Sequence, residues 1–134
     1  MSRENVELVR LIYAVWERGD FTLAEWADPE IEYVHADGPD AGSWKGPAEM
    51  ARRFRTRLSA WEGFRLEADE YRELEPDRVL VLDRLSGRGK TSGLDLERIQ
   101  SRGAWLFHVR DGRVTRMVRY NDRDRALEAV GLRE

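Results

Sequence analysis

The sequence predicts an α+β fold in which helices near the amino end pack on one face of a strongly curved, mostly antiparallel sheet. Two observations support this prediction. Apolar residues recur at helical spacing over roughly the first 60 residues, whereas further along the chain they alternate with polar residues, as in strands. Strong turn signals then separate the second half into long neighbouring strands. The 134 residues have the size of one domain, which we assign to 1–134.

Three helices are expected before the main part of the sheet. Residues 3–18 carry apolar side chains at helical spacing, and 21–27 (FTLAEWA) predict a second, short helix that ends at the Asp28-Pro29 turn. A strand over Ile31–His35 follows. The third helix, at about 47–61, begins with a proline, which suits a first helical position, and carries one apolar stripe.

Long strands and a closing helix make up the rest of the chain. The strands are expected at 64–74, 78–87, 96–110 and 113–121, and the helix at 122–130. Alternation slips near Asp69, which predicts a bulge, and Asp111-Gly112 predicts a tight hairpin. The run RVLVLDRLSG is apolar on both faces as far as Asp83, so we expect helices to cover one side and a second subunit to cover the other.

Composition excludes several classes of function. Charged residues make up 37% of the chain, but 23 basic residues nearly balance 26 acidic ones, and the net charge is −3. This balance disfavours nucleic acid or an anionic membrane as a partner. The absence of cysteine excludes disulfides and a thiolate nucleophile. The start, MSRENVEL, lacks the apolar core of a secretion signal, and no apolar run has membrane-spanning length, so we expect a cytoplasmic protein.

The stretch Ile31–Gly46 holds the best candidates for chemistry. Tyr33, His35 and Asp37 alternate at period two, so in an extended segment their side chains leave one face together. In the functional interpretation His35 or Asp37 is a general base that removes a proton next to a carbonyl group. In the alternative, Tyr33 packs, His35 is a satisfied polar residue and Asp37 starts a turn. A metal site with Asp40 is less favoured, because the loop does not guarantee its geometry.

Aromatic residues are numerous enough to wall a pocket for a flat, hydrophobic small molecule. Most of them should form core. Those expected to line a pocket are Tyr33, Trp44, Phe54, Trp105 and Tyr120. Asp83 is added to this set because a carboxylate in an apolar strand is costly unless it is paired or neutral. We expect a salt bridge to Arg98 or Arg116 in preference to a raised-pKa acid.

The order of elements resembles the SnoaL-like, or ketosteroid-isomerase-like, branch of the nuclear-transport-factor-2-like superfamily. The resemblance runs from end to end. It is carried by ENVELVRLIYAVWERGD, by the W-K-G before the third helix, by RLSGRGKTSG, by VRDGRV and by RALEAVGL. It implies a cone-shaped α+β barrel, a pocket between the long helix and the concave sheet, and a homodimer formed through the sheet. It leaves the reaction open, because this fold hosts isomerases, cyclases, dehydratases, hydrolases and binding proteins.

Individual positions match the family unevenly. Tyr13 resembles the family's catalytic tyrosine, and Asp37 lies in the region of its base. Trp105 stands where an acidic donor is expected, and an indole cannot titrate, so steroid isomerisation is not expected. Limonene-epoxide-hydrolase chemistry is not expected either, since Asp83 and Arg84 are adjacent and should point to opposite faces of the sheet.

Two functions therefore remain. The first is cofactor-free proton transfer on a hydrophobic polyketide-, steroid- or terpenoid-like carbonyl compound. In it Asp37 or His35 is the base, and Tyr13 donates a hydrogen bond to the developing oxyanion. The second is a non-catalytic binding or dimeric assembly module of the same fold. No metal or cofactor is expected in either.

Overall fold

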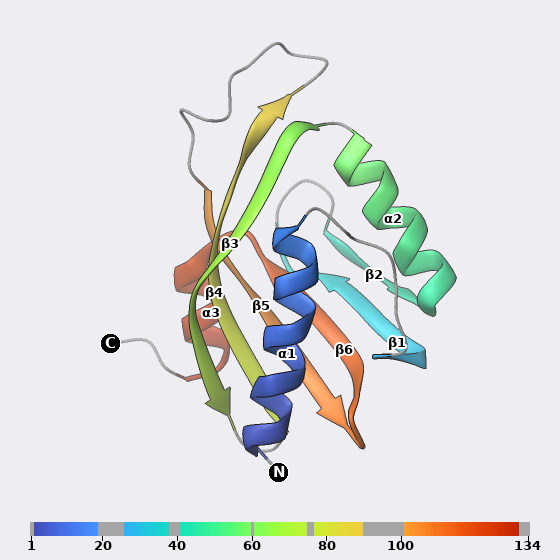
Figure 1. Cartoon of the computed structure of the whole chain (residues 1–134), viewed down its shortest axis with the longest axis vertical. Helices are drawn as coiled ribbons and strands as arrows, with labels where there is room; N and C mark the ends of the chain where they lie inside the picture. Colours follow the sequence, from blue (N-terminus) through green and yellow to red (C-terminus); the bar gives the residue numbers. More distant parts are fainter. Residues whose placement is uncertain are drawn as a thin grey trace.

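A single six-stranded sheet carries helices on both of its faces (Figure 1). The computed structural model describes residues 2–18, 26–37, 41–59, 61–74, 77–89 and 101–131. Its helices are α1 (Ser2–Glu17), α2 (Pro47–Ser59) and α3 (Arg123–Ala129). Its strands are β1 (Ala27–His35), β2 (Gly42–Lys45), β3 (Trp61–Leu74), β4 (Arg78–Gly89), β5 (Ser101–Arg110) and β6 (Arg113–Tyr120). The predicted α+β class is confirmed.

The strands run in the order β2-β1-β6-β5-β4-β3, so β2 and β3 are the edges of an open sheet. β1 pairs with β6 in parallel, and the other neighbouring pairs are antiparallel. Asp111 and Gly112 both have positive φ, 52° and 75°, which is the tight hairpin that the sequence predicts. The predicted bulge near Asp69 is also present, between Ala68 and Glu70. A second register shift lies opposite His108 and Val109 of β5, where Thr115 of β6 is the extra residue.

The inner face of the sheet is covered by α1 and α2. α1 crosses this face in Figure 1, and its buried residues Val9, Ile12, Tyr13 and Trp16 follow helical spacing. They pack with alternate residues of the central strands, such as Phe107 on β5, in one apolar core. Because strand residues two apart share a face, the same strands present every second side chain to α1.

The outer face is covered by α3, which packs on a second apolar cluster. Leu80 and Leu82 of β4 belong to this cluster together with Ala126 of α3. Asp122 caps the helix by accepting a hydrogen bond from the backbone N–H of Asp124 at 2.9 Å. On the outer side of β4, for which the sequence suggested a second subunit, both leucines are therefore already buried within this chain.

Several element boundaries differ from those predicted. β1 begins at Ala27, so Asp28-Pro29 lies in a strand and does not form the predicted turn. This strand tolerates its proline because the β1–β6 register shifts between Ala27 and Glu32, where a missing N–H breaks no regular ladder. Residues 19–25, which include most of the predicted second helix, lie outside the described residues.

Two further differences involve strand pairing. Residues 42–45, for which no strand was predicted, form β2, because each of them pairs with a residue of β1. Trp61 begins β3 by pairing with Gly89, and so does not close the third helix, which ends at Ser59. In both cases pairing with a distant strand overrides the local pattern. Residues 90–100, which contain most of the segment expected between the predicted strands 78–87 and 96–110, are not described.

Candidate functional site

A buried ion pair lies at the centre of the inner face. Asp83 on β4 is 0% exposed and Arg119 on β6 is 2% exposed. Arg119 Nη1 donates to both carboxylate oxygens, at 3.0 Å to Oδ1 and 2.7 Å to Oδ2. Two charges removed from water in this way are stable only when they are closely paired and hydrogen-bonded. The prediction that Asp83 forms a salt bridge is confirmed, although with a different arginine.

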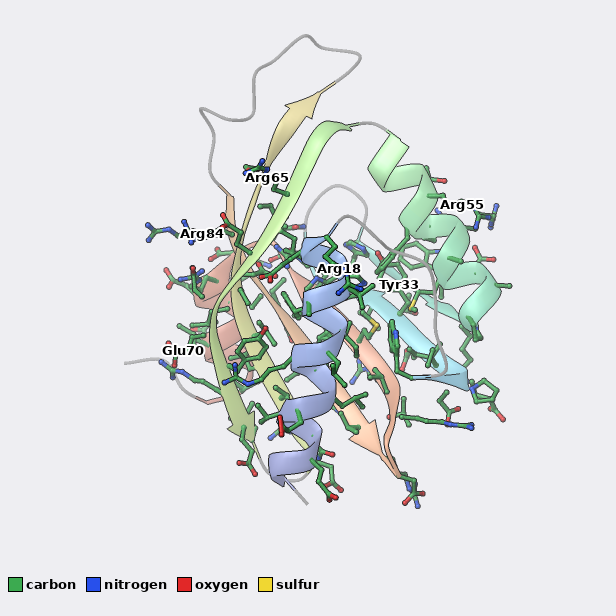
Figure 2. All side chains as sticks on the ribbon, in the orientation of Figure 1. Arg18, Tyr33, Arg55, Arg65, Glu70 and Arg84 are labelled. Carbon is green, nitrogen blue, oxygen red and sulfur yellow. The ribbon has the colours of Figure 1, made fainter. Side chains whose placement is uncertain are left out.

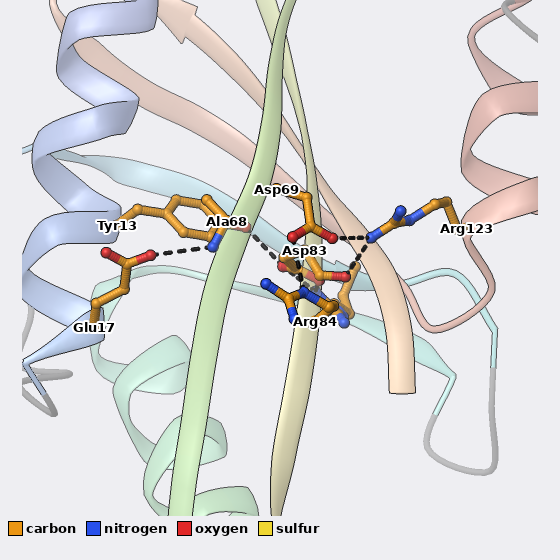
Figure 3. Close-up of polar contacts among 8 residues, drawn as sticks. Tyr13, Glu17, Ala68, Asp69, Asp83, Arg84 and Arg123 are labelled. Carbon is orange, nitrogen blue, oxygen red and sulfur yellow. Dashed lines mark hydrogen bonds and ion pairs between the residues drawn. The ribbon is translucent and has the colours of Figure 1, made fainter. Parts of the chain in front are cut away.

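Tyr13 completes the hydrogen bonding of this pair from α1. Its hydroxyl donates to Asp83 Oδ2 at 2.8 Å (Figure 3). One turn further along α1, Glu17 accepts a hydrogen bond at 3.1 Å from the backbone N–H of Ala68, at the bulge of β3. Since Ala68 is the strand partner of Asp83, these two contacts hold the helix directly above the carboxylate. The proton of Tyr13 is therefore directed at Asp83.

The environment of Tyr13 keeps its hydroxyl protonated. Burial raises the pKa of Tyr13 well above its usual value, and the neighbouring Asp83 carboxylate raises it further, while the Arg119 guanidinium acts in the opposite direction. A tyrosine with so high a pKa is a hydrogen-bond donor at neutral pH and does not act as a base. Tyr13 thus holds the ion pair in place.

Gly103 on β5 makes the Asp83–Arg119 contact possible. Gly103 is the strand partner of Asp83. The end of the Arg119 side chain lies over Gly103 where it reaches the Asp83 carboxylate. A Cβ at this position would be 2.4 Å from Arg119 Nη2 and 2.5 Å from the backbone oxygen of Tyr120. Neither contact is tolerable, so only glycine leaves room for the arginine here.

Tyr33 and His35 form a second polar pair on the inner face, on β1. The Tyr33 hydroxyl and His35 Nε2 are 2.5 Å apart, and both residues are buried, at 1% and 3% exposed. Their alternation along β1 places both side chains on the face that α1 and α2 cover, as the sequence predicts. Figure 2 shows Tyr33 between these two helices, whereas Arg55 and Arg84 project outward.

Trp105 connects the two polar groups. Its ring is stacked on Tyr33 with centroids 5.9 Å apart, and the His35 ring lies 6.3 Å away. The Arg119 guanidinium carbon is 5.6 Å from the indole centroid. His35 and Trp105 are also the strand partners of Arg119 on either side. The two polar groups therefore lie next to each other along one aromatic surface.

Other aromatic rings surround Trp105. Phe54 of α2 is 6.2 Å from it, and Trp16 of α1 is 5.9 Å from it, both in tilted arrangements. Trp44 on β2 is more exposed, and the guanidinium of Arg53 lies over its ring at 4.4 Å. The predicted pocket residues Tyr33, Trp44, Phe54 and Trp105 are thus brought together with Asp83 on one side of the sheet. We refer to the inner-face set of Tyr13, Tyr33, His35, Asp83, Trp105 and Arg119 as the candidate site.

Two sequence-predicted residues lie apart from the candidate site. The Asp37 carboxylate accepts hydrogen bonds from the backbone N–H groups of Asn121 at 2.8 Å and Asp122 at 3.3 Å, at the junction of β6 and α3. Tyr120 packs on the outer-face cluster, where burial raises the pKa of its hydroxyl. The described hydrogen bonds of Asp37 therefore connect it to the start of α3 and not to Tyr13 or His35.

The partner predicted for Asp83 requires a correction. Arg116 forms an ion pair with Glu32 of β1, at 3.2 Å, and Arg119 takes its place beside Asp83. Arg98, the other candidate, lies outside the described residues. Arg84 points to the outer face, where it pairs with Asp69 at 2.8 Å, so adjacent Asp83 and Arg84 do face opposite ways as expected.

Sequence reasoning missed Arg119 and Gly103. A glycine inside a predicted strand often marks a close approach of another group, and this signal could have singled out Gly103.

Among the described residues, no group of three His, Asp or Glu side chains is arranged to hold a metal ion, and Asp40 is not described. None of the described helices is long and apolar enough to cross a membrane.

The fold is that of nuclear-transport-factor-2-like proteins of known structure. One such protein, from Burkholderia thailandensis, is 24% identical with a TM-score of 0.76, over 87% of this chain and 88% of its own. TerC, co-crystallized with polyporic acid, is 23% identical with a TM-score of 0.74, over 95% and 97%. A structure described as a SnoaL-like polyketide cyclase, from Jannaschia sp. CCS1, is 16% identical with a TM-score of 0.72, over 89% and 85%.

The family follows from the sequence itself. The model of the SnoaL-like domain matches residues 9–117, which is most of the chain. The chain therefore belongs to the SnoaL-like family, as the resemblance implied. No curated protein matches it.

Proposed function

We propose that this protein binds a hydrophobic carbonyl compound against the aromatic surface around Trp105 and catalyses a cofactor-free proton transfer on it. The observation that carries the proposal is the buried, hydrogen-bonded pair of Tyr33 and His35 beside Trp105. A phenol and an imidazole in direct contact are a suitable acid–base pair near neutral pH. Asp83 is less suited as a base, because its carboxylate oxygens already accept hydrogen bonds from Arg119 and Tyr13.

In the proposed step, the C–H bond next to the carbonyl group breaks and its proton moves to the Tyr33 hydroxyl oxygen. The original Tyr33 proton moves at the same time to His35 Nε2, which the 2.5 Å contact allows. The electron pair of the C–H bond passes into the carbonyl group and gives an enolate. Return of the proton to a different carbon isomerises the compound, and attack of the enolate carbon on a second carbonyl within the molecule closes a ring.

The ligand class is supported by the residues and by the relatives. A flat, aromatic molecule can make the same kind of stacked and tilted contacts that Trp105, Tyr33 and Phe54 make with one another. Among the similar structures, TerC was co-crystallized with polyporic acid, and two others are described as polyketide cyclases. We therefore favour polyketide-like aromatic carbonyl compounds over steroids and terpenoids.

Exchange of carbonyl-adjacent hydrogen tests the proposed step without knowledge of the natural substrate. 1-Indanone, a small bicyclic aromatic ketone, is incubated with the protein in D₂O, and loss of its C2 proton signal is followed by NMR. The wild-type protein should accelerate this exchange, and His35→Gln should reduce the acceleration by about 100-fold or more. Binding of 1-indanone, measured by calorimetry, should change little.

His108→Gln is the matched control. His108 is the only other histidine in the chain, and it lies on the outer-face side of β5 between Arg78 and Arg116. This variant should keep wild-type exchange. If His35→Gln exchanges as fast as wild type, the proposed acid–base pair is wrong.

The second function is binding without turnover. It is favoured by the mutual hydrogen bonding of Tyr13, Asp83 and Arg119, which is also what a rigid binding surface requires. Tight binding of 1-indanone with no acceleration of exchange in the wild-type protein would support this function over catalysis.

A further inference from the structure

One nitrogen of Arg119 is buried without a partner. Nη1 makes both hydrogen bonds to Asp83, while Nη2 is buried and forms no hydrogen bond within the part of the chain that the structure describes. The residue as a whole is 2% exposed. Buried donors of charged groups are nearly always satisfied in proteins, and an exception needs an explanation. A bound ligand that supplies the missing acceptor is one such explanation.

The position of this nitrogen relates it to the candidate site. Arg119 is the strand partner of both His35 and Trp105, and all three side chains are on the inner face. A group that lies on Trp105 and reaches the Tyr33–His35 pair would therefore also lie beside the Arg119 guanidinium. Nη2 itself lies above Gly103, 2.4 Å from where a Cβ would be. Because Gly103 has no side chain, there is room for the nitrogen at this position.

We propose that Arg119 Nη2 recognises the carbonyl oxygen of the ligand, so that the site selects ketones over hydrocarbons of the same shape. This inference rests on the proposed function, since it names the group that would hold the oxygen while Tyr33 and His35 move the proton. The hydrogen bond from the charged N–H becomes stronger as the oxygen gains negative charge in the enolate. Arg119 is thus a specificity-determining residue that contacts the ligand.

The charge balance of the site points to a neutral carbonyl group. The Asp83 carboxylate forms an ion pair with Arg119 Nη1 at 2.7 Å, and an ion pair as a whole carries no net charge. A ligand carboxylate would gain the attraction of Arg119 but would also face the repulsion of Asp83. A ketone oxygen needs only a donor, which Nη2 provides without any change in the ion pair.

Two ligands of equal shape test the inference: 1-indanone and indane, which lacks the carbonyl oxygen. The measured quantity is the ratio of their dissociation constants, indane over 1-indanone. Arg119→Lys keeps the charge beside Asp83 but has no second nitrogen, so it should lower this ratio by about tenfold or more. Arg116→Lys is the matched control. It changes an arginine of the same strand that pairs with Glu32, and it should leave the ratio unchanged.

A spectroscopic measurement requires no variant. Infrared difference spectra of bound 1-indanone should show its carbonyl stretching band at lower frequency than in water, as a charged donor in a dry site causes. Gly103→Ala, which forces Nη2 to move, should shift the band back and lower the affinity ratio. This second variant keeps the test valid if Arg119→Lys does not fold.

The outcomes separate this inference from the proposed function. An unchanged ratio in Arg119→Lys, or a bound carbonyl band at the frequency seen in a hydrocarbon solvent, would overturn the inference even if His35-dependent exchange is found. A ratio that depends on Arg119 in a protein that does not accelerate exchange would support the inference and leave binding as the function. If neither ligand binds, both proposals are wrong.

Discussion

Asp83 shows how a single buried charge constrains the residues around it. Its carboxylate accepts from Arg119 and Tyr13 on the inner face, and its backbone oxygen accepts from Arg123 of α3 at 2.8 Å (Figure 3). One residue is thus held by α1, β6 and α3. Loss of any one of these donors leaves a buried oxygen of Asp83 with one hydrogen bond fewer.

Removing the charge of Asp83 should destabilise the protein more than removing the whole ion pair. Asp83→Asn leaves Arg119 buried and unpaired, and should lower the free energy of unfolding by about 3–5 kcal/mol. The double variant Asp83→Leu with Arg119→Met removes both charges and should be closer to wild type than Asp83→Asn. Urea unfolding of the three proteins measures this. Equal stability of the single and double variants would contradict the interpretation.

Tyr13 should make the protein sensitive to alkaline pH. Burial and Asp83 raise the folded-state pKa of this hydroxyl, so the folded chain retains a proton that the unfolded chain loses above its ordinary pKa of about 10. The stabilisation is therefore complete below about pH 10 and is lost as the pH rises above it. Tyr13→Phe should show a shallower decline in unfolding free energy above about pH 10, measured by urea titration at several pH values. Parallel declines would count against this role.

At the scale of elements, one bulge explains both the missed arginine and the displaced tyrosine. Arg110 pairs with Arg113 and Val109 with Val114, as in a regular hairpin, but His108 pairs with Arg116 because of the bulge between His108 and Val109. Without the bulge, Trp105 would pair with Val118, and Arg116 and Tyr120 would face inward. The shift of one residue brings Arg119 inward instead.

The sequence therefore predicted what depends on local pattern. The α1 stripe, the Asp111-Gly112 turn, the opposite directions of Asp83 and Arg84 and the shared face of Tyr33 and His35 follow from helical or period-two spacing. What it could not provide is register, which depends on bulges and on pairing between distant strands. β2 and the partner of Asp83 belong to this second kind.

Asp37 should be important for α3 and not for ligand binding. Its carboxylate accepts from two backbone N–H groups at the start of this helix, and Asp37→Ala should lower the free energy of unfolding by about 1–3 kcal/mol. Amide hydrogen exchange in α3 should speed up, while 1-indanone affinity stays within about twofold of wild type. Loss of deuterium exchange into 1-indanone with an undisturbed α3 would instead restore Asp37 as the base.

At the scale of the whole molecule, the two sheet faces have different partners. The inner face carries α1 and α2, and on the outer face Leu80 and Leu82 are buried in the apolar cluster to which Ala126 of α3 belongs. Of the large apolar side chains whose exposure is described, only Leu11 on α1 is largely exposed, at 67%. The apolar outer side of β4 thus no longer requires a second subunit, and the dimer prediction rests on the family resemblance.

A homodimer through the sheet remains a prediction that sedimentation velocity can check. At micromolar concentration we expect about twice the chain mass of 15.7 kDa. The outer-face ion pairs among Asp69, Arg84 and Arg123 would then lie near the interface, and the dimer should weaken as salt concentration rises. A monomer at all salt concentrations would contradict the prediction.

The ion pair also has a consequence for the order of events in folding. Tyr13 and Asp83 are 70 positions apart in the chain, and Asp83 and Arg119 are 36 apart, so closing these loops opposes early formation of either contact. The Asp83 carboxylate loses its bound water only when α1, β4 and β6 have come together. We therefore expect this step to follow the folding transition state. Substitutions at Asp83 should therefore accelerate unfolding while leaving the refolding rate nearly unchanged.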